Sequence, residues 1–183
     1  MSRPVTESTP PNEMCLTQGA AFWSQIDRDG SGRSGAIWDN LGVVRWRFAA
    51  RRNPAGRSWC NPFNTLDFVV TEAANGAELV IRRASWAPSV FQIRDGEEVI
   101  GQVRVRSLLR HRYSIEIDGV NTWTFRMPIF TLNFYANSES GTDIWVVVGP
   151  SKMDWKILMR PGSGDRQLVA ALAFIHTEWW NLC

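Results

Sequence analysis

The segment from Arg166 to Leu182 constrains the fold of this 183-residue chain more than any other. It contains no glycine or proline, is rich in good helix formers, and follows Asp165, a suitable N-cap residue, so we expect a helix over residues 165–182. Its middle, Leu168 to Ile175, consists of eight consecutive apolar residues, which cover every side of a helix rather than one stripe. Such a helix must be enclosed by the rest of the protein.

The remainder of the chain alternates apolar and polar residues with the period of two that marks half-buried strands. The apolar members of four such segments are Val44, Trp46 and Phe48; Val99, Val103 and Val105; Tyr113, Ile115 and Ile117; and Trp123, Phe125 and Met127. Turn-forming pairs such as Asn75-Gly76 and Asp95-Gly96 separate the segments and favour antiparallel hairpins, about ten strands in all. The predicted fold class is mainly β: an antiparallel, closed or nearly closed β-barrel around a buried apolar C-terminal α-helix.

The length indicates one domain, which we place at residues 36–183. Residues 1–35 are predicted to be a disordered tail followed by a glycine-rich loop at 27–35 (DRDGSGRSG). The three cysteines, Cys15, Cys60 and Cys183, form no C-x-x-C pair, which argues against a disulfide framework or a zinc knuckle. The N-terminal residues lack the apolar region of a signal peptide, and the longest apolar run is far shorter than the roughly 20 residues that span a bilayer. We expect a cytoplasmic protein without a transmembrane segment.

The functional candidates are two arginine-rich stretches. The net charge is only +2, so nucleic acid is not an expected partner, and any anionic ligand must be bound by a local patch. One stretch contains Arg104, Arg106, Arg110, His111 and Arg112, and the other contains Arg45, Arg47, Arg51 and Arg52. Positions i and i+2 of a strand share a face, so paired guanidinium groups could fork onto phosphate oxygens. The alternative interpretation is a solvated sheet face, and the sequence does not decide between the two.

Four short motifs follow one another in the middle of the chain: Phe91-Gln92-Ile93-Arg94-Asp95-Gly96, Val99-Ile100-Gly101, Arg104-Val105-Arg106 and Tyr113-Ser114-Ile115. Their succession resembles the repeated unit of the tubby C-terminal-like superfamily, which includes tubby domains, LURP-one-related proteins and phospholipid scramblases. The apolar C-terminal run is similar to the helix that these proteins place inside a twelve-stranded barrel. The resemblance implies that Arg104 and Arg106 occupy the place of the basic pair that binds phosphoinositide headgroups in tubby domains. The scramblase calcium ligands and palmitoylated cysteine-rich stretch have no match here.

Other motifs are weaker. Asp27, Asp29, Ser31 and Gly32 imitate the start of a calcium loop, but Trp38 stands where the twelfth-position glutamate is needed. His176 and Glu178 form half of a zinc deaminase signature without the cysteine half, and we interpret them as the polar end of the buried helix. Carboxylates that could pair across strands are Glu97, Glu98, Glu116, Asp118, Asp143 and Asp154. Trp46, Trp123 and Trp155 are predicted to be core residues, whereas Trp179 and Trp180 could close a barrel mouth or lie at an interface.

The sequence therefore predicts a non-enzymatic tubby-like domain without catalytic residues, metal or cofactor. Its expected ligand is a phosphoinositide or another anionic membrane surface, bound by Arg104, Arg106, Arg110, Arg112, Arg45 and Arg47. Two alternatives remain open. An enzyme would carry paired acids in a surface cleft, and a protein-interaction scaffold would expose tryptophan in a large apolar patch.

Overall fold

The computed structural model describes residues 20–26, 34–52, 66–85, 89–107, 112–117, 121–126, 133–138, 141–148, 154–159 and 166–182. These residues form twelve β-strands and one α-helix. The elements are β1 (Ala20–Ile26), β2 (Ser34–Asp39), β3 (Val44–Arg52), β4 (Leu66–Glu72), β5 (Glu78–Ser85), β6 (Ser89–Asp95), β7 (Glu98–Ser107), β8 (Arg112–Ile117), β9 (Asn121–Arg126), β10 (Asn133–Ser138), β11 (Gly141–Val148), β12 (Asp154–Met159) and α1 (Arg166–Leu182).

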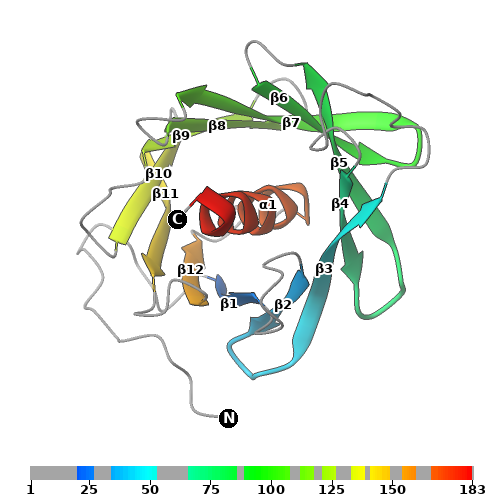
Figure 1. Cartoon of the computed structure of the whole chain (residues 1–183). Helices are drawn as coiled ribbons and strands as arrows, with labels where there is room; N and C mark the ends of the chain where they lie inside the picture. Colours follow the sequence, from blue (N-terminus) through cyan, green and yellow to red (C-terminus); the bar gives the residue numbers. More distant parts are fainter. Residues whose placement is uncertain are drawn as a thin grey trace.

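The strands pair antiparallel in the order of the sequence, from β2 through to β12. β1 pairs with β12 on one side and with β2 on the other, and Figure 1 shows the sheet curving around α1. The sequence prediction of a mainly β fold, with an antiparallel sheet and a C-terminal helix, is confirmed. The helix begins one residue later than predicted and ends where it was expected.

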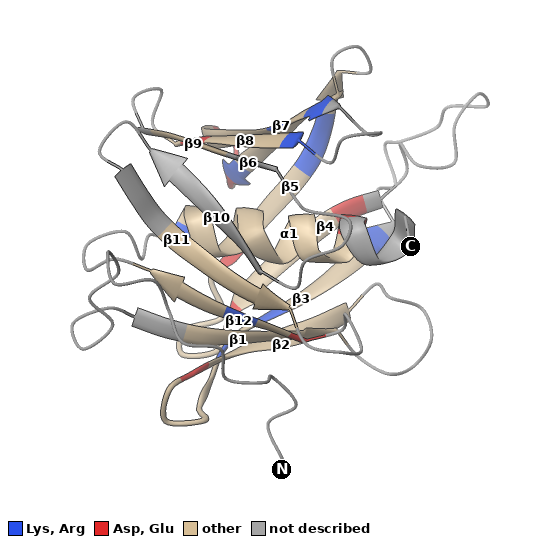
Figure 2. Cartoon of the chain, turned by 90° about the vertical axis from the view of Figure 1, so that its left-hand side faces the viewer, with Lys and Arg blue, Asp and Glu red and all other residues tan. Residues whose placement is uncertain are grey.

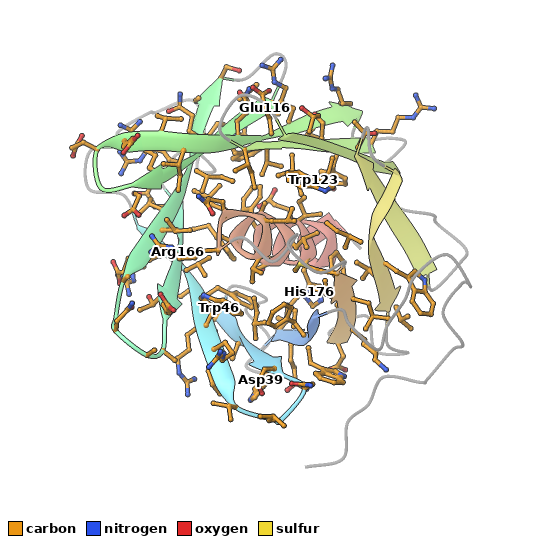
Figure 3. All side chains as sticks on the ribbon, turned by 180° about the vertical axis from the view of Figure 1, so that it is seen from behind. Asp39, Trp46, Glu116, Trp123, Arg166 and His176 are labelled. Carbon is orange, nitrogen blue, oxygen red and sulfur yellow. The ribbon has the colours of Figure 1, made fainter. Side chains whose placement is uncertain are left out.

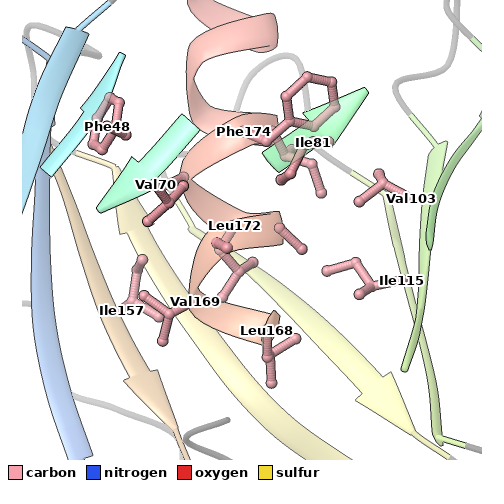
Figure 4. Packing of buried hydrophobic residues seen from close by; sticks show 14 of the residues in the cluster. Phe48, Val70, Ile81, Val103, Ile115, Ile157, Leu168, Val169, Leu172 and Phe174 are labelled. Atoms are coloured by element: carbon pink, nitrogen blue, oxygen red, sulfur yellow. The ribbon is translucent and has the colours of Figure 1, made fainter. Parts of the chain in front are cut away.

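The apolar stretch of α1 is enclosed along its whole length. Residues Leu168 to Ile175 have exposed fractions of 4% or less. The ring of Phe174 packs against Phe68 on β4 and Phe91 on β6, with centroid separations of 5.5 and 4.7 Å, so it contacts the two strands on either side of β5. Figure 4 shows the surrounding aliphatic side chains directed at the helix. The sheet supplies the cover that an all-round apolar helix requires.

The inward side chains follow the predicted alternation through most of the sheet. Buried members include Phe48, Val70, Ile81, Ile93, Val103, Ile115 and Ile157. Trp123 and Trp155 are buried and Trp46 packs against the same core, which confirms the prediction that these three are core residues. The outward residues alternate with them, so any chemistry open to solvent along the strands must come from the other face of the sheet.

Two sequence predictions about the strands are wrong. The folded part was expected to start near Ala36, with about ten strands, but β1 already pairs along its length with β12. Val99 was expected to face the core and is 46% exposed. The cause is a register shift in β7, in which Arg94 pairs with Val99 and Ile93 pairs with Gly101. The extra residue, Ile100, reverses the phase of the strand at this point.

Gly35 was assigned to a glycine-rich loop, but it lies inside β2 and faces the core. A Cβ atom at this position would collide with the backbone oxygen of Gln25 and with the ring of Phe48. Glycine is therefore needed here for the close approach of two strands rather than for a turn. Ser34 and Gly35 therefore belong to β2, which begins two residues before the predicted start of the domain.

The enclosure of α1 gives the first prediction. Leu172→Ala should lower the free energy of unfolding by roughly 2–5 kcal/mol, because the site is fully buried and the surrounding sheet cannot collapse into the cavity. Urea unfolding followed by tryptophan fluorescence measures the loss. Leu41→Ala removes the same atoms from an exposed position and should change the free energy by less than about 0.5 kcal/mol. Equal losses for the two variants would contradict the buried position of the helix.

Candidate functional site

Three of the predicted arginines gather on the outer face where β7 ends and β8 begins. Arg104 and Arg106 lie two residues apart on β7, and Arg112 is the first residue of β8. Arg104 pairs with Ser114, whereas Arg112 pairs with Ser107, because the register shifts between Val105 and Ser107. Figure 2 shows basic residues on β7. We call Arg104, Arg106 and Arg112 the β7–β8 arginine patch; Arg110 and His111 lie outside the described residues.

The β7–β8 arginine patch differs from the other arginines in its electrostatic surroundings. Five of the other arginines that the structure describes have a carboxylate partner: Arg45 with Asp39 at 3.7 Å, Arg51 with Glu78 at 3.0 Å, Arg82 with Asp67 at 2.6 Å, Arg94 with Glu97 at 3.9 Å and Arg166 with Asp95 at 2.6 Å. Within the described part of the chain, no carboxylate pairs with the three arginines of the patch. Among the described residues, these three positive charges occupy neighbouring positions without a paired carboxylate, an arrangement that favours an anion.

Ser114 lies in the middle of this patch. Arg106 donates from Nε to its Oγ at 3.3 Å, and the residue is only 3% exposed because the neighbouring side chains cover it. The Nε atom of Arg104, directly across the strand pair, is buried and has no hydrogen-bond partner among the described residues. A buried donor without an acceptor is energetically costly.

The second predicted stretch, Arg45 and Arg47, belongs to a different surface. Both side chains are exposed on β3, but β4, β5 and β6 lie between this strand and β7. β3 and β7 run in the same direction, since four antiparallel pairings separate them. Arg45 and Arg47 lie near the start of β3, whereas Arg104 and Arg106 lie near the end of β7. The two stretches therefore do not form one anion site.

A polar cluster interrupts the apolar interior near the C-terminal end of α1. Ser24 Oγ and His176 Nδ1 are 3.0 Å apart, and the indole ring of Trp155 stacks on the imidazole at a centroid separation of 4.2 Å. Ser24 and His176 are both completely buried, so the pair is closed to a substrate in this structure. The geometry supports the structural interpretation of His176 as a satisfied polar residue of the buried helix.

The sequence analysis placed Glu178 at the polar end of the buried helix but missed Arg83, a charged residue on the inward face of β5. Arg83 shares the inward phase of Leu79 and Ile81 on β5, and its guanidinium lies 4.8 Å from the centroid of the Phe91 ring. Burial lowers the pKa of Arg83, and the charge of Glu178 acts in the opposite direction. Burial likewise raises the pKa of Glu178, which the charge of Arg83 partly offsets. The period-two pattern of β5 could have identified Arg83 as an interior residue.

The remaining candidates show no catalytic grouping. Glu97 pairs with Arg94, Glu116 accepts a hydrogen bond from Gln102 at 2.6 Å, and Asp154 accepts one from Gln25 at 2.7 Å. The calcium-like motif at 27–32 and the side chains of Asp118, Asp143, Trp179 and Trp180 lie outside the described part of the chain. Among the residues that the structure describes, no group of three or more His, Cys, Asp or Glu side chains could hold a metal ion.

Comparisons with protein-family models, curated proteins and solved structures find no match to this chain. The tubby-like resemblance therefore depends on its motif residues. In the described part of the chain, no helix is both long and apolar enough to cross a membrane.

The buried carboxyl of Glu178 predicts a pH dependence of stability. Burial holds its pKa in the folded protein above the ordinary value of 4.5, so the folded state binds more protons than the unfolded state in the pH range just above that value. The free energy of unfolding should consequently fall as the pH rises from about 4.5 through the folded pKa. Glu178→Gln should flatten this part of the profile, as measured by the melting temperature at a series of pH values. Glu97→Gln, at a fully exposed position, should keep the profile of the parent.

Proposed function

We propose that this chain is a non-enzymatic, tubby-like module that binds a phosphate-bearing ligand through the β7–β8 arginine patch. The observation that carries the proposal is that Arg104, Arg106 and Arg112 lie at neighbouring positions on the outer face of β7 and β8, with no carboxylate partner among the described residues. The ligand chemistry is that of a phosphomonoester, as found on a phosphoinositide headgroup or a soluble inositol phosphate.

The chemistry of the patch favours phosphate over a carboxylate ligand. A phosphomonoester carries a charge of about −1.5 to −2 at neutral pH and three acceptor oxygens. Guanidinium groups present several N–H donors in a planar fork that matches two such oxygens. Ser114 accepts a hydrogen bond from Arg106 Nε, which helps to hold that guanidinium group on the patch. Several donors on one small surface can therefore bind different oxygens of one phosphate.

The tubby-like part of the proposal includes a closed barrel around the helix. The pairing of β1 with both β12 and β2 supports closure of the sheet. The apolar α1 enclosed by twelve strands, and the position of Arg104 and Arg106 on the strand after Ile100 and Gly101, agree with the arrangement that the resemblance implies. The partners already found for Glu97, Glu116 and Asp154 favour this function over an enzyme with paired surface acids.

Replacing two arginines of the patch tests the proposed function. Arg104→Ala with Arg106→Ala should weaken binding of a fluorescent soluble inositol trisphosphate at least about tenfold, because each charge-assisted contact is worth more than 1 kcal/mol. Fluorescence anisotropy at physiological salt measures the affinity. A second arm compares sedimentation with phosphatidylcholine vesicles that contain or lack phosphoinositide, which separates a membrane headgroup from a soluble ligand as the source of the phosphate.

The matched control is Arg51→Ala with Arg94→Ala, which removes the same number of guanidinium groups from sites already paired with carboxylates. This variant should bind almost as well as the parent. A third variant, Arg104→Lys with Arg106→Lys, keeps the charge but loses the fork and should have intermediate affinity. If both alanine variants bound the inositol phosphate equally weakly, net charge alone would explain the binding, and a specific phosphate site on β7 and β8 would be contradicted.

A further inference from the structure

The hairpin that joins β2 and β3 exposes an apolar tip. Leu41 is 81% exposed and Val43 is 51% exposed. Among the described residues, these two and Val99 are the exposed large hydrophobic side chains. Two of the three therefore lie within three residues of one another, on either side of Gly42. Exposure of two neighbouring apolar side chains to water is unfavourable. It suggests that the tip is covered by a binding partner or a membrane when the protein functions.

The tip is held in a defined conformation by its own polar groups. Asp39 Oδ1 accepts hydrogen bonds from the backbone N–H of Leu41 and of Val43, at 2.9 and 3.0 Å. Backbone bonds from Asp39 N to Val43 O and from Gly42 N to Asp39 O close the turn, and Gly42 takes the positive φ of 79° that the turn requires. The two apolar side chains are thus presented by an ordered hairpin.

Two tryptophans and a lysine lie on the outer face of the sheet, on the successive strands β2, β1 and β12. Trp38 pairs with Val44 on β3 and with Trp23 on β1, and Trp23 pairs in turn with Lys156 on β12. Both tryptophans are half-buried, and the Lys156 amine lies 5.7 Å from the ring centroid of Trp23.

The hairpin also leaves a positive balance of charge. Arg45 and Arg47 project from the adjoining part of β3. Asp39, a carboxylate at the base, already pairs with Arg45 at 3.7 Å and accepts hydrogen bonds from the two tip amides. Arg47 is exposed and adds further positive charge, so the surface around the apolar tip attracts anions.

We propose that the β2–β3 hairpin inserts its apolar tip into the interface of an anionic bilayer. The succession of aliphatic side chains, tryptophan rings and cations matches the order of acyl chains, interface and anionic headgroups in a membrane. A protruding tip enters a fluid phase without needing a complementary pocket, whereas a protein partner would have to provide one. Arg47 accounts for the preference for anionic lipid, and Leu41 and Val43 account for the insertion.

This proposal is independent of the phosphate site. Figure 3 places Asp39, at the base of the hairpin, and Glu116, on β8, on opposite sides of α1. A molecule attached by the hairpin therefore holds the β7–β8 arginine patch away from the same bilayer. Vesicles without phosphoinositide report the hairpin, and the soluble inositol phosphate reports the arginine patch.

The test is sedimentation with vesicles of phosphatidylcholine and phosphatidylserine that contain no phosphoinositide. The parent should bind, and Leu41→Ser with Val43→Ser should bind about tenfold more weakly or worse, because burial of each apolar side chain contributes to the affinity. The variant should melt at the temperature of the parent, since both positions are exposed. Its affinity for the soluble inositol phosphate should also be unchanged.

Val99→Ser is the matched control, because it removes an exposed aliphatic side chain from the β6–β7 hairpin instead. It should bind these vesicles as the parent does, and so should Arg104→Ala with Arg106→Ala. Failure of the parent to bind, parent-like binding by the Leu41 and Val43 variant, or equal weakening by Val99→Ser would each overturn the proposal. A lack of vesicle binding together with a parent dimer that the Leu41 and Val43 variant converts to a monomer, in sedimentation equilibrium, would assign the tip to self-association instead.

Discussion

The structure depends on the removal of one helix from water. Eight consecutive apolar residues in α1 leave no side of the helix that could face solvent, so the strands must surround it instead of packing against one face. This constraint fixes the role of each strand: one face contributes hydrocarbon to the helix, and the other meets water. It also explains why Ala170, Ala171 and Ala173 alternate with larger residues, since small side chains let the sheet approach while Leu172 and Phe174 reach between the inward side chains.

A filled interior moves the functional chemistry to the outer face of the sheet. The polar groups that remain inside lie near the C-terminal end of α1, where Ser24 contacts His176 and Arg83 interacts with Glu178. Burial lowers the pKa of Arg83 and raises that of Glu178, so it disfavours the charged form of each, while their mutual attraction partly offsets this effect. These groups are part of the packing of the domain, whereas the arginines on β7 and β8 lie on its outer face.

The parts of the fold that follow from a long, regular pattern were predicted from the sequence, and the parts that depend on pairing between strands were not. The helix and the inward phase of Trp123 and Trp155 follow from period and length alone. Val99 was assigned to the wrong face because a register shift depends on the partner strand. Gly35 was assigned to a loop because its local composition contains no information about the Phe48 ring that occupies the space of a side chain.

The candidate site illustrates the same limit in electrostatic terms. Arg45 and Arg104 occur in similar alternating segments, and their sequences do not distinguish them. The two arginines differ in the residue on the neighbouring strand. Asp39 lies across the β2–β3 hairpin from Arg45, whereas Arg104 lies opposite Ser114. Whether an arginine has a carboxylate beside it thus depends on the pairing of strands, which its own segment of the sequence does not reveal. The same pairing places Trp23 beside Trp38, and so turns an ordinary hairpin into an apolar tip with an aromatic base.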